Sequence, residues 1–138
     1  MTDAPTADVP ARLAFATGRL NRRLRSAGGG LSHGLLSALA TVRTHGPLRL
    51  AELAQLETVS APSTTRLVAE LESKGLVTRA PDPDDGRAIL ITVTDHGVDT
   101  IATARAARAA MIAELFEPLT TDEVAAITAA LPALEKMI

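Results

Sequence analysis

Hydrophobic and polar residues alternate along this chain with two periods, and the longer one dominates. Over most of the chain apolar residues recur every three or four positions, which is the spacing of a buried stripe on an amphipathic helix. Glycine, proline or a capping residue borders these stretches, so each one predicts a separate helix. The predicted helices cover residues 10–27, 32–44, 50–56, 61–73, 95–117 and 121–138.

Local signals mark the ends of the first and last helices. The glycines at 28–30 should stop the first helix. Thr121 or Asp122 is expected to cap the last helix, which Pro132 should kink or shorten. One helix at each end of the chain therefore lies outside a central group of shorter helices.

The shorter period occurs once, between residues 76 and 97. Pro81 and Pro83 exclude a helix there, and residues 84–86 supply turn chemistry. Apolar residues then alternate with polar ones as in a half-buried strand, at Ile89, Ile91 and Val93. This pattern predicts a short β-hairpin, with Arg87 just past its turn and pointing away from any core.

Two of the predicted helices, 50–56 and 61–73, are joined by a tight turn and form a helix-turn-helix candidate. Ser60 is expected to cap the second of them, and Pro62 fits its first turn, where a missing N–H costs nothing. The hairpin follows directly. The sequence therefore predicts a mainly α protein with a small β-wing, in which residues 31–95 form a winged helix-turn-helix lobe.

Composition sets bounds on the core and on the compartment. The 138 residues suit a single domain, and with 1% aromatic residues its core must consist of Leu, Val, Ile and Ala. The sequence contains no cysteine, which excludes disulfides, thiolate metal sites and cysteine-based redox sensing. No apolar run reaches the roughly 20 residues of a membrane span, and the first ten residues lack a secretion signal. We expect a cytoplasmic protein without a membrane partner.

The placement of the charges matters more than their sum. A formal net charge of −2 argues weakly against a nucleic-acid partner, but net charge averages over all faces of a protein. Twelve of the fourteen cations are arginines, which fork onto phosphates and guanine edges. None lies between Arg87 and Arg105, so the basic groups gather mainly in the first two thirds of the chain.

The helix predicted over 61–73 has an apolar and a polar face. Its apolar face carries Thr64, Leu67, Val68 and Leu71, and its polar face carries Pro62, Ser63, Thr65 and Arg66. A major groove admits one helix, whose first residues reach base edges. Arg66 is therefore predicted to fork onto guanine, while the Ser and Thr hydroxyls bond phosphates or bases. The alternative is an ordinary helical hairpin with a solvated polar face.

The predicted wing favours the DNA interpretation. It follows the reading helix directly and would place Arg87 at the neighbouring minor groove, whose narrow form attracts arginine. Asp85 lies two residues before Arg87, on the same side of an extended chain. We therefore expect Asp85 to hold the Arg87 guanidinium in place.

Other chemistries find little support. His33, His45 and His96 lie apart, without metal-ligand spacing, so we expect capping or solvent-facing roles and neither metal nor cofactor. The sequence has neither a nucleophile elbow nor a phosphate-binding loop, which leaves an enzyme poorly supported. The arginine-rich run 19–25 is either a solvated helix face or a membrane-surface or nucleic-acid patch.

Three short motifs near the predicted wing carry a family resemblance. They are the helix end LESKGLVTR, the wing DPDDGR with Asp85 and Arg87, and the TVTDHG that opens the next helix. Together they resemble the winged helix-turn-helix core of the MarR regulators. The resemblance implies a ligand-responsive repressor that reads a pseudo-palindromic operator on double-stranded DNA as a homodimer. It further implies one domain over 1–138, in which 10–27 and 96–138 are dimerisation helices.

Apolar stripes at both ends of the chain agree with a dimer. Leucine and isoleucine exceed what two terminal helices on a small core would need, at Leu13, Leu20, Leu24, Ile127, Leu131 and Leu134. The implied effector, anionic or lipophilic, would bind between these helices and the DNA-binding lobe. Candidate ligand contacts are Phe15, Arg22 and Arg23.

Three residues depart from the family's pattern. Thr58 stands where glycine is common in the turn, so it must take a conformation other than glycine's. Arg49 stands where Ser or Thr usually caps the helix, trading the cap for a phosphate contact. Gly86 replaces a second arginine and leaves Arg87 as the lone cation at the wing tip.

The predicted DNA contacts are thus Arg49, Ser60, Pro62, Ser63, Thr65, Arg66, Asp85 and Arg87. Two other interpretations stay open. The first is a protein of the same fold that binds DNA without an effector, constitutively or architecturally. The second is a small dimerisation module whose wing is vestigial.

Overall fold

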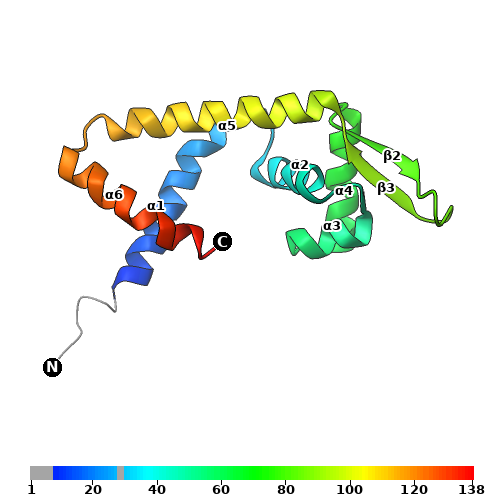
Figure 1. The fold of residues 1–138 in the computed structure, drawn as a ribbon, viewed down its shortest axis with the longest axis horizontal. Helices are drawn as coiled ribbons and strands as arrows, with labels where there is room; N and C mark the ends of the chain where they lie inside the picture. The colour runs from blue at the N-terminus through cyan, green and yellow to red at the C-terminus, as the bar shows by residue number, and fades with distance from the viewer. Residues whose placement is uncertain (1–7, 28–29) are drawn as a thin grey trace.

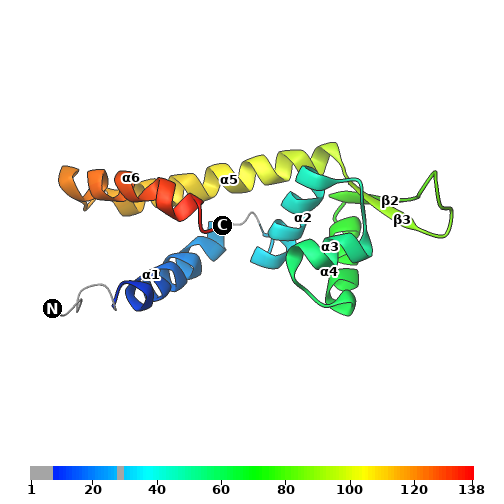
Figure 2. The same ribbon diagram turned by 60° about the horizontal axis from the view of Figure 1, so that its bottom comes forward.

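The computed structural model describes residues 8–27 and 30–138, in which helices gather at both ends of one long helix (Figures 1 and 2). The long helix is α5 (Asp95–Phe116). A lobe at one of its ends contains α2 (His33–His45), α3 (Leu50–Glu57) and α4 (Ala61–Ser73). At its other end lie α1 (Val9–Leu24), followed by a short 3₁₀ turn η1 (Arg25–Ala27), and α6 (Thr121–Glu135).

An antiparallel sheet with the strand order β1-β3-β2 projects from the lobe (Figure 1). Its strands are β1 (Leu48–Arg49), β2 (Val77–Pro81) and β3 (Ile89–Val93). Leu48 lies opposite Ile91, and Val77 lies opposite Val93. The β2-β3 hairpin confirms the predicted wing and the mainly α fold with a small β part. The sequence pattern does not reveal β1, because two residues are too few to show a period of two.

The core lies in the lobe and is aliphatic, as the composition predicts. The largest side chains with less than 2% exposure are Leu39, Val42, Leu53, Thr64, Val68, Leu71, Val77, Ile91 and Ile101. On α4 these residues, with Leu67 packed beside them, confirm the predicted apolar face. Neither α1 nor α6 contributes a buried residue.

The helix ends follow the predicted signals in the lobe and depart from them in α6. Thr120 caps α6, not Thr121 or Asp122, because Thr120 and Glu123 form a reciprocal capping box with bonds of 2.8 and 3.2 Å. α6 continues past Pro132 and ends at Glu135, short of the predicted end at residue 138. Of the glycines expected to stop the first helix, Gly28 and Gly29 lie outside the described residues.

The start of α5 is fixed against the turn that ends α4. Thr94 donates its hydroxyl to the Gly75 carbonyl at 2.7 Å and its N–H to the Leu76 carbonyl at 3.0 Å. As the N-cap of α5 it also accepts the Gly97 N–H at 3.0 Å. A Cβ at Gly97 would overlap the Leu76 carbonyl oxygen and lie 2.7 Å from a Val93 methyl group. Only glycine lets the helix and the turn approach this closely.

We therefore expect Gly97→Ala to destabilise the fold by about 2 kcal/mol, because the added methyl meets backbone that cannot rotate away. The matched control is Gly34→Ala in α2, where a Cβ would make ordinary contact with Leu67 at 3.8 Å. Losing a helical glycine there should raise stability by about 0.5 kcal/mol. Urea unfolding of the two variants checks this, and equal shifts in both would contradict the close approach.

Candidate nucleic-acid interface

The first two turns of α4 present the predicted reading residues on one side of the helix. Ser60 is the N-cap and accepts the Ser63 N–H at 3.4 Å, and proline occupies the first turn as predicted. Ser60, Pro62, Thr65 and Arg66 are exposed and Ser63 is half-buried. The structure therefore brings these five residues together at the start of one helix.

The hydroxyls on this surface already have defined partners. The Ser60 hydroxyl donates to the Ser63 oxygen at 2.9 Å, and the Arg66 guanidinium donates to the same oxygen at 3.3 Å. The Thr65 hydroxyl instead donates to the Ala61 carbonyl at 3.0 Å, one turn back along its own helix. Ser63 and Arg66 therefore form a linked pair from which Thr65 is separate.

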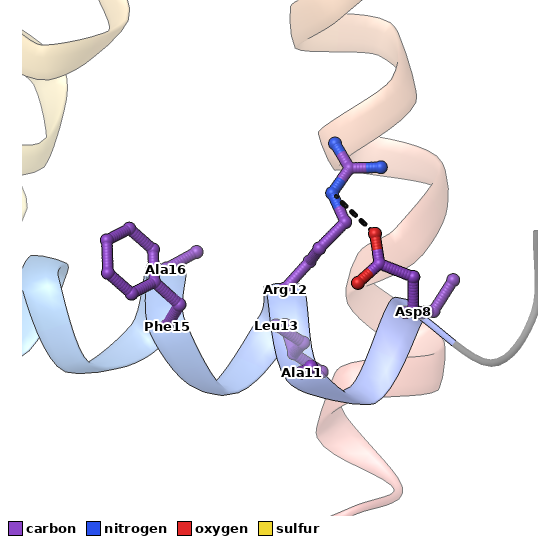
Figure 3. Close-up of a pocket in the computed structure, with 7 residues that line it drawn as sticks. Asp8, Ala11, Arg12, Leu13, Phe15 and Ala16 are labelled. Atoms are coloured by element: carbon purple, nitrogen blue, oxygen red, sulfur yellow. Dashed lines mark ion pairs between the residues drawn. The ribbon is translucent and has the colours of Figure 1, made fainter.

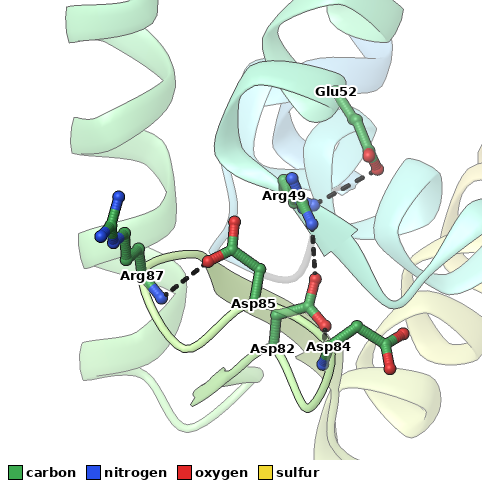
Figure 4. Close-up of polar contacts among 6 residues, drawn as sticks. All are labelled: Arg49, Glu52, Asp82, Asp84, Asp85 and Arg87. Atoms are coloured by element: carbon green, nitrogen blue, oxygen red, sulfur yellow. Dashed lines mark hydrogen bonds and ion pairs between the residues drawn. The ribbon is translucent and has the colours of Figure 1, made fainter.

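The wing turn differs from the prediction at Asp85. Its carboxylate accepts the backbone N–H of Arg87 at 3.1 Å, and its carbonyl accepts the Ala88 N–H at 2.9 Å. The Arg87 guanidinium points away from Asp85 (Figure 4). The expectation that Asp85 holds this guanidinium is therefore wrong, because the chain turns here and is not extended. Asp85 shapes the turn that presents Arg87.

Asp82 is a functional candidate that the sequence reading missed. Its carboxylate accepts the Arg49 guanidinium at 2.7 Å and the Asp84 N–H at 2.9 Å (Figure 4). Its own N–H donates to the Ala88 carbonyl across the hairpin at 2.9 Å. Asp82 is buried while the Arg49 side chain keeps 43% of its exposure, so the pair ties the wing to the start of α3. The signal in the sequence is an aspartate placed between two prolines.

This pairing changes the ionisation of both groups. The Asp84 N–H and then the Arg49 guanidinium stabilise the carboxylate and hold the pKa of Asp82 below its usual value. The hydrogen bond to Asp82 in turn raises the pKa of Arg49. Because the folded-state pKa of Asp82 is lowered, the pair stabilises the wing above the unfolded pKa, and this contribution is lost as pH falls through the folded value.

Arg49 also begins α3 without the usual Ser or Thr cap. Its backbone N–H donates to the Glu52 carboxylate at 3.4 Å, so half of a capping box remains. Its guanidinium is occupied on one side by Asp82, and the exposed remainder can still meet a phosphate.

The turn between α3 and α4 adopts the conformation that glycine favours. Thr58 has φ 55° and ψ 44°, which is left-handed backbone, and the Val59 N–H closes the turn on the Ala54 carbonyl at 3.1 Å. The expectation that Thr58 takes a conformation other than glycine's is therefore wrong. A β-branched residue here costs about 1–2 kcal/mol relative to glycine, so the turn geometry is kept at the expense of stability.

The two arginines predicted to read DNA, Arg66 and Arg87, take no part in the ion pairs of the described residues. Arg49 pairs with Asp82, and Arg79 on β2 pairs with Glu72 on α4 at 3.2 Å. Within the described ranges, no carboxylate lies within 4.0 Å of the Arg66 or Arg87 guanidinium. Both groups are exposed and keep their positive charge available to an anionic partner.

The predicted ligand residues do not form one site. Phe15 is 69% exposed on α1, with the Arg19 guanidinium 5.6 Å from its ring, and lines a hollow on that helix (Figure 3). Arg22 and Arg23 line a different hollow of about 380 Å³, against Met111, Glu114 and Leu115 of α5.

A third cavity, of about 260 Å³, lies between α2 and α5. Two arginines of α5, Arg105 and Arg108, line it. The other lining residues are His33, Leu36, Ser37, Ala40 and Ile101. The Arg108 Nε is buried and makes no hydrogen bond within residues 8–27 and 30–138. The sequence reading missed this pair, although its signal was visible as two arginines, three residues apart, in a helix otherwise rich in alanine.

Over residues 8–27 and 30–138, no three His, Asp or Glu side chains are grouped as metal ligands would be. His33, His45 and His96 are all exposed. None of the described helices is long and apolar enough to cross a membrane.

Comparison with known proteins agrees with this architecture. A model of the MarR family matches residues 31–89. The HTH-type transcriptional regulator Mb0904 of Mycobacterium bovis is 39% identical over 122 residues, which cover 84% of this chain and 85% of that protein. The HTH-type transcriptional repressor MdtR of Bacillus subtilis is 32% identical over 95 residues, which cover 69% of this chain and 61% of that protein.

A solved structure of another protein shares this fold. A MarR family protein from Bacillus stearothermophilus has a TM-score of 0.80 at 22% identity, over 99% of this chain and 97% of that one. The motifs around the wing, the arrangement of α3, α4 and the hairpin, and these relatives lead to one assignment. The chain belongs to the MarR family of helix-turn-helix transcriptional regulators.

Proposed function

We propose that this protein is a ligand-responsive transcriptional repressor that binds a pseudo-palindromic operator as a homodimer in the cytoplasm. The observation that carries the DNA-binding part is the pair of exposed arginines, Arg66 on α4 and Arg87 on the wing, which have no carboxylate partner in the described chain. Two nearby acids, Asp82 and Glu72, pair with Arg49 and Arg79 instead. A weakly acidic protein thereby keeps two unpaired cations at its predicted reading elements.

Each proposed DNA contact has a role that its position supports. Arg66 reads base edges in the major groove, surrounded by Ser60, Pro62, Ser63 and Thr65. Arg87 enters the adjacent minor groove from the turn that Asp85 shapes. Arg49 contacts a phosphate with the side of its guanidinium that Asp82 leaves exposed.

The homodimer proposal rests on apolar surface at the two ends of the chain. Phe15 on α1 and Leu131 on α6 are 69% and 44% exposed, and neither helix buries a residue. A hollow of about 610 Å³ between α1 and α6 is lined by Leu13, Ala14, Leu131, Leu134 and Met137. A second copy would cover this surface, so we assign 10–27 and 96–138 to dimerisation.

Repression and effector control are supported by separate observations. The relative MdtR is itself named a repressor. The cavity between α2 and α5 offers an effector two arginines that pair with no carboxylate among the described residues, and the Nε of one of them is buried and unbonded there. Burying an unbonded guanidinium N–H is costly, so a small anion bound there would gain a strong hydrogen bond. An effector at this place, between the lobe and α5, would release DNA only if it bound the DNA-free conformation of the protein more tightly than the DNA-bound one.

For DNA binding, we expect Arg66→Ala to cost about 1–3 kcal/mol per half-site and to relax base preference, because it removes a base contact. Arg87→Ala should weaken binding with little effect on preference at major-groove positions. Arg12→Ala, on α1 and paired with Asp8, is the cation-matched control. Selection of bound genomic fragments followed by competition binding checks these outcomes. Unchanged binding in both arginine variants would refute the proposed function.

For assembly, we expect Leu131→Glu to convert the protein to monomers and abolish operator binding, because a charge would lie inside the dimer surface. Thr121→Glu adds the same charge to the first turn of α6, where a helix N-terminus favours acids, and should leave the dimer intact. Sedimentation velocity distinguishes these results. A dimeric and fully active Leu131→Glu protein would show that α6 is not at the interface.

For effector control, small aliphatic and aromatic monocarboxylates should lower the operator affinity of the protein about fivefold or more. Arg108→Met should bind the operator normally but lose this response, because it removes the unbonded guanidinium. The combined Arg22→Ala and Arg23→Ala change tests the other hollow. Loss of the response only in that second protein would move the effector site there, and no response in any protein would favour constitutive DNA binding.

A further inference from the structure

We infer that Ser63 is a specificity-determining residue, which positions Arg66 as part of a donor-only pair that selects guanine in each half-site. The inference rests on the proposed DNA-binding function and deepens it. It names the base edge that the start of α4 reads and the residue that sets the choice.

The argument starts from the position of the Arg66 guanidinium. Glu70 lies four residues further along α4, at the spacing that usually favours an ion pair on a helix. The guanidinium instead donates to the Ser63 oxygen at 3.3 Å, one turn toward the helix start, and no ion pair with Glu70 forms. Ser63 therefore directs Arg66 toward the helix start, the part of a recognition helix that reaches base edges.

The hydrogen bonds at Ser63 determine what it can offer to DNA. Its oxygen accepts from the Ser60 hydroxyl at 2.9 Å and from Arg66, so both of its lone pairs are occupied. What remains is its own hydroxyl proton. The Arg66 guanidinium has only donors by its chemistry. Side by side, the two residues present hydrogen-bond donors and no acceptor.

The major-groove edges of the four bases respond differently to such a pair. Guanine presents two acceptors, N7 and O6, whereas adenine and cytosine each present an amino group that would face the pair's donors. Thymine presents a single acceptor beside its methyl group. A donor-only pair therefore favours guanine. Thr65 cannot supply this selection, because its hydroxyl proton is already used by the Ala61 carbonyl at 3.0 Å.

The test selects bound fragments from a random DNA library with the full-length protein and its variants. The starting protein should enrich guanine at one position of each half-site. Ser63→Ala should lower that guanine preference about three- to tenfold, the worth of one hydrogen bond, while Ser63→Thr keeps the hydroxyl and should restore it. Thr44→Val on α2, which removes an exposed hydroxyl that donates to the Ala40 carbonyl of its own helix at 3.0 Å, is the matched control and should leave the preference unchanged.

A double-mutant comparison separates positioning from a merely structural role. In an Arg66→Ala background, Ser63→Ala should have no further effect on guanine preference, because it acts through Arg66. Thermal unfolding of each variant checks the fold. An unchanged preference in Ser63→Ala, or a loss that persists without Arg66, would overturn the inference while leaving the proposed function intact. Failure of the starting protein to select any sequence would overturn both.

Discussion

The rest of the structure depends on the close approach between the start of α5 and the turn that ends α4. At this point Thr94 bonds two consecutive carbonyls, Gly75 and Leu76, and the absent side chain of Gly97 lets the helix touch backbone. Three elements meet there, since β3 runs into α5 and β2 begins just after the turn. The reading helix, the wing and the long helix are thus held in one fixed arrangement. A side chain at that glycine would separate all three.

Several acidic side chains near the proposed DNA-binding surface bind partners within the protein. The wing is rich in aspartate, yet Asp82 is committed to Arg49 and to the Asp84 backbone, and Asp85 is committed to its own turn. Glu72 is occupied by Arg79. The two ion pairs, Arg49–Asp82 and Arg79–Glu72, connect the wing to the lobe and offset two carboxylate charges that would repel phosphates. The overall acidity of the chain and an attraction to DNA at one surface are therefore compatible.

How far the sequence could predict the structure depends on the range of the interactions. The bounds of α4 were predictable because Ser60, Pro62 and Gly75 are signals within the helix and its immediate flanks. β1 and the Arg49–Asp82 pair were not, because they join residues 33 or more positions apart whose meeting depends on the fold. The cap of α6 was missed although it is local, since Thr120 and Thr121 stand side by side and only the spacing to Glu123 distinguishes them.

The length of α5 has a mechanical consequence. Its 22 residues span about 33 Å. One end packs against α4 and the wing, and the apolar helices α1 and α6 lie at the other end. Over that span a tilt of about 6° displaces the far end by about 3.4 Å, the rise of one base pair. In the proposed dimer, a rearrangement too small to disturb any helix would therefore move a reading helix out of register with its bases. A slight tilt of α5 at the end that carries α1 and α6 would therefore shift α4 by about one base pair along the DNA.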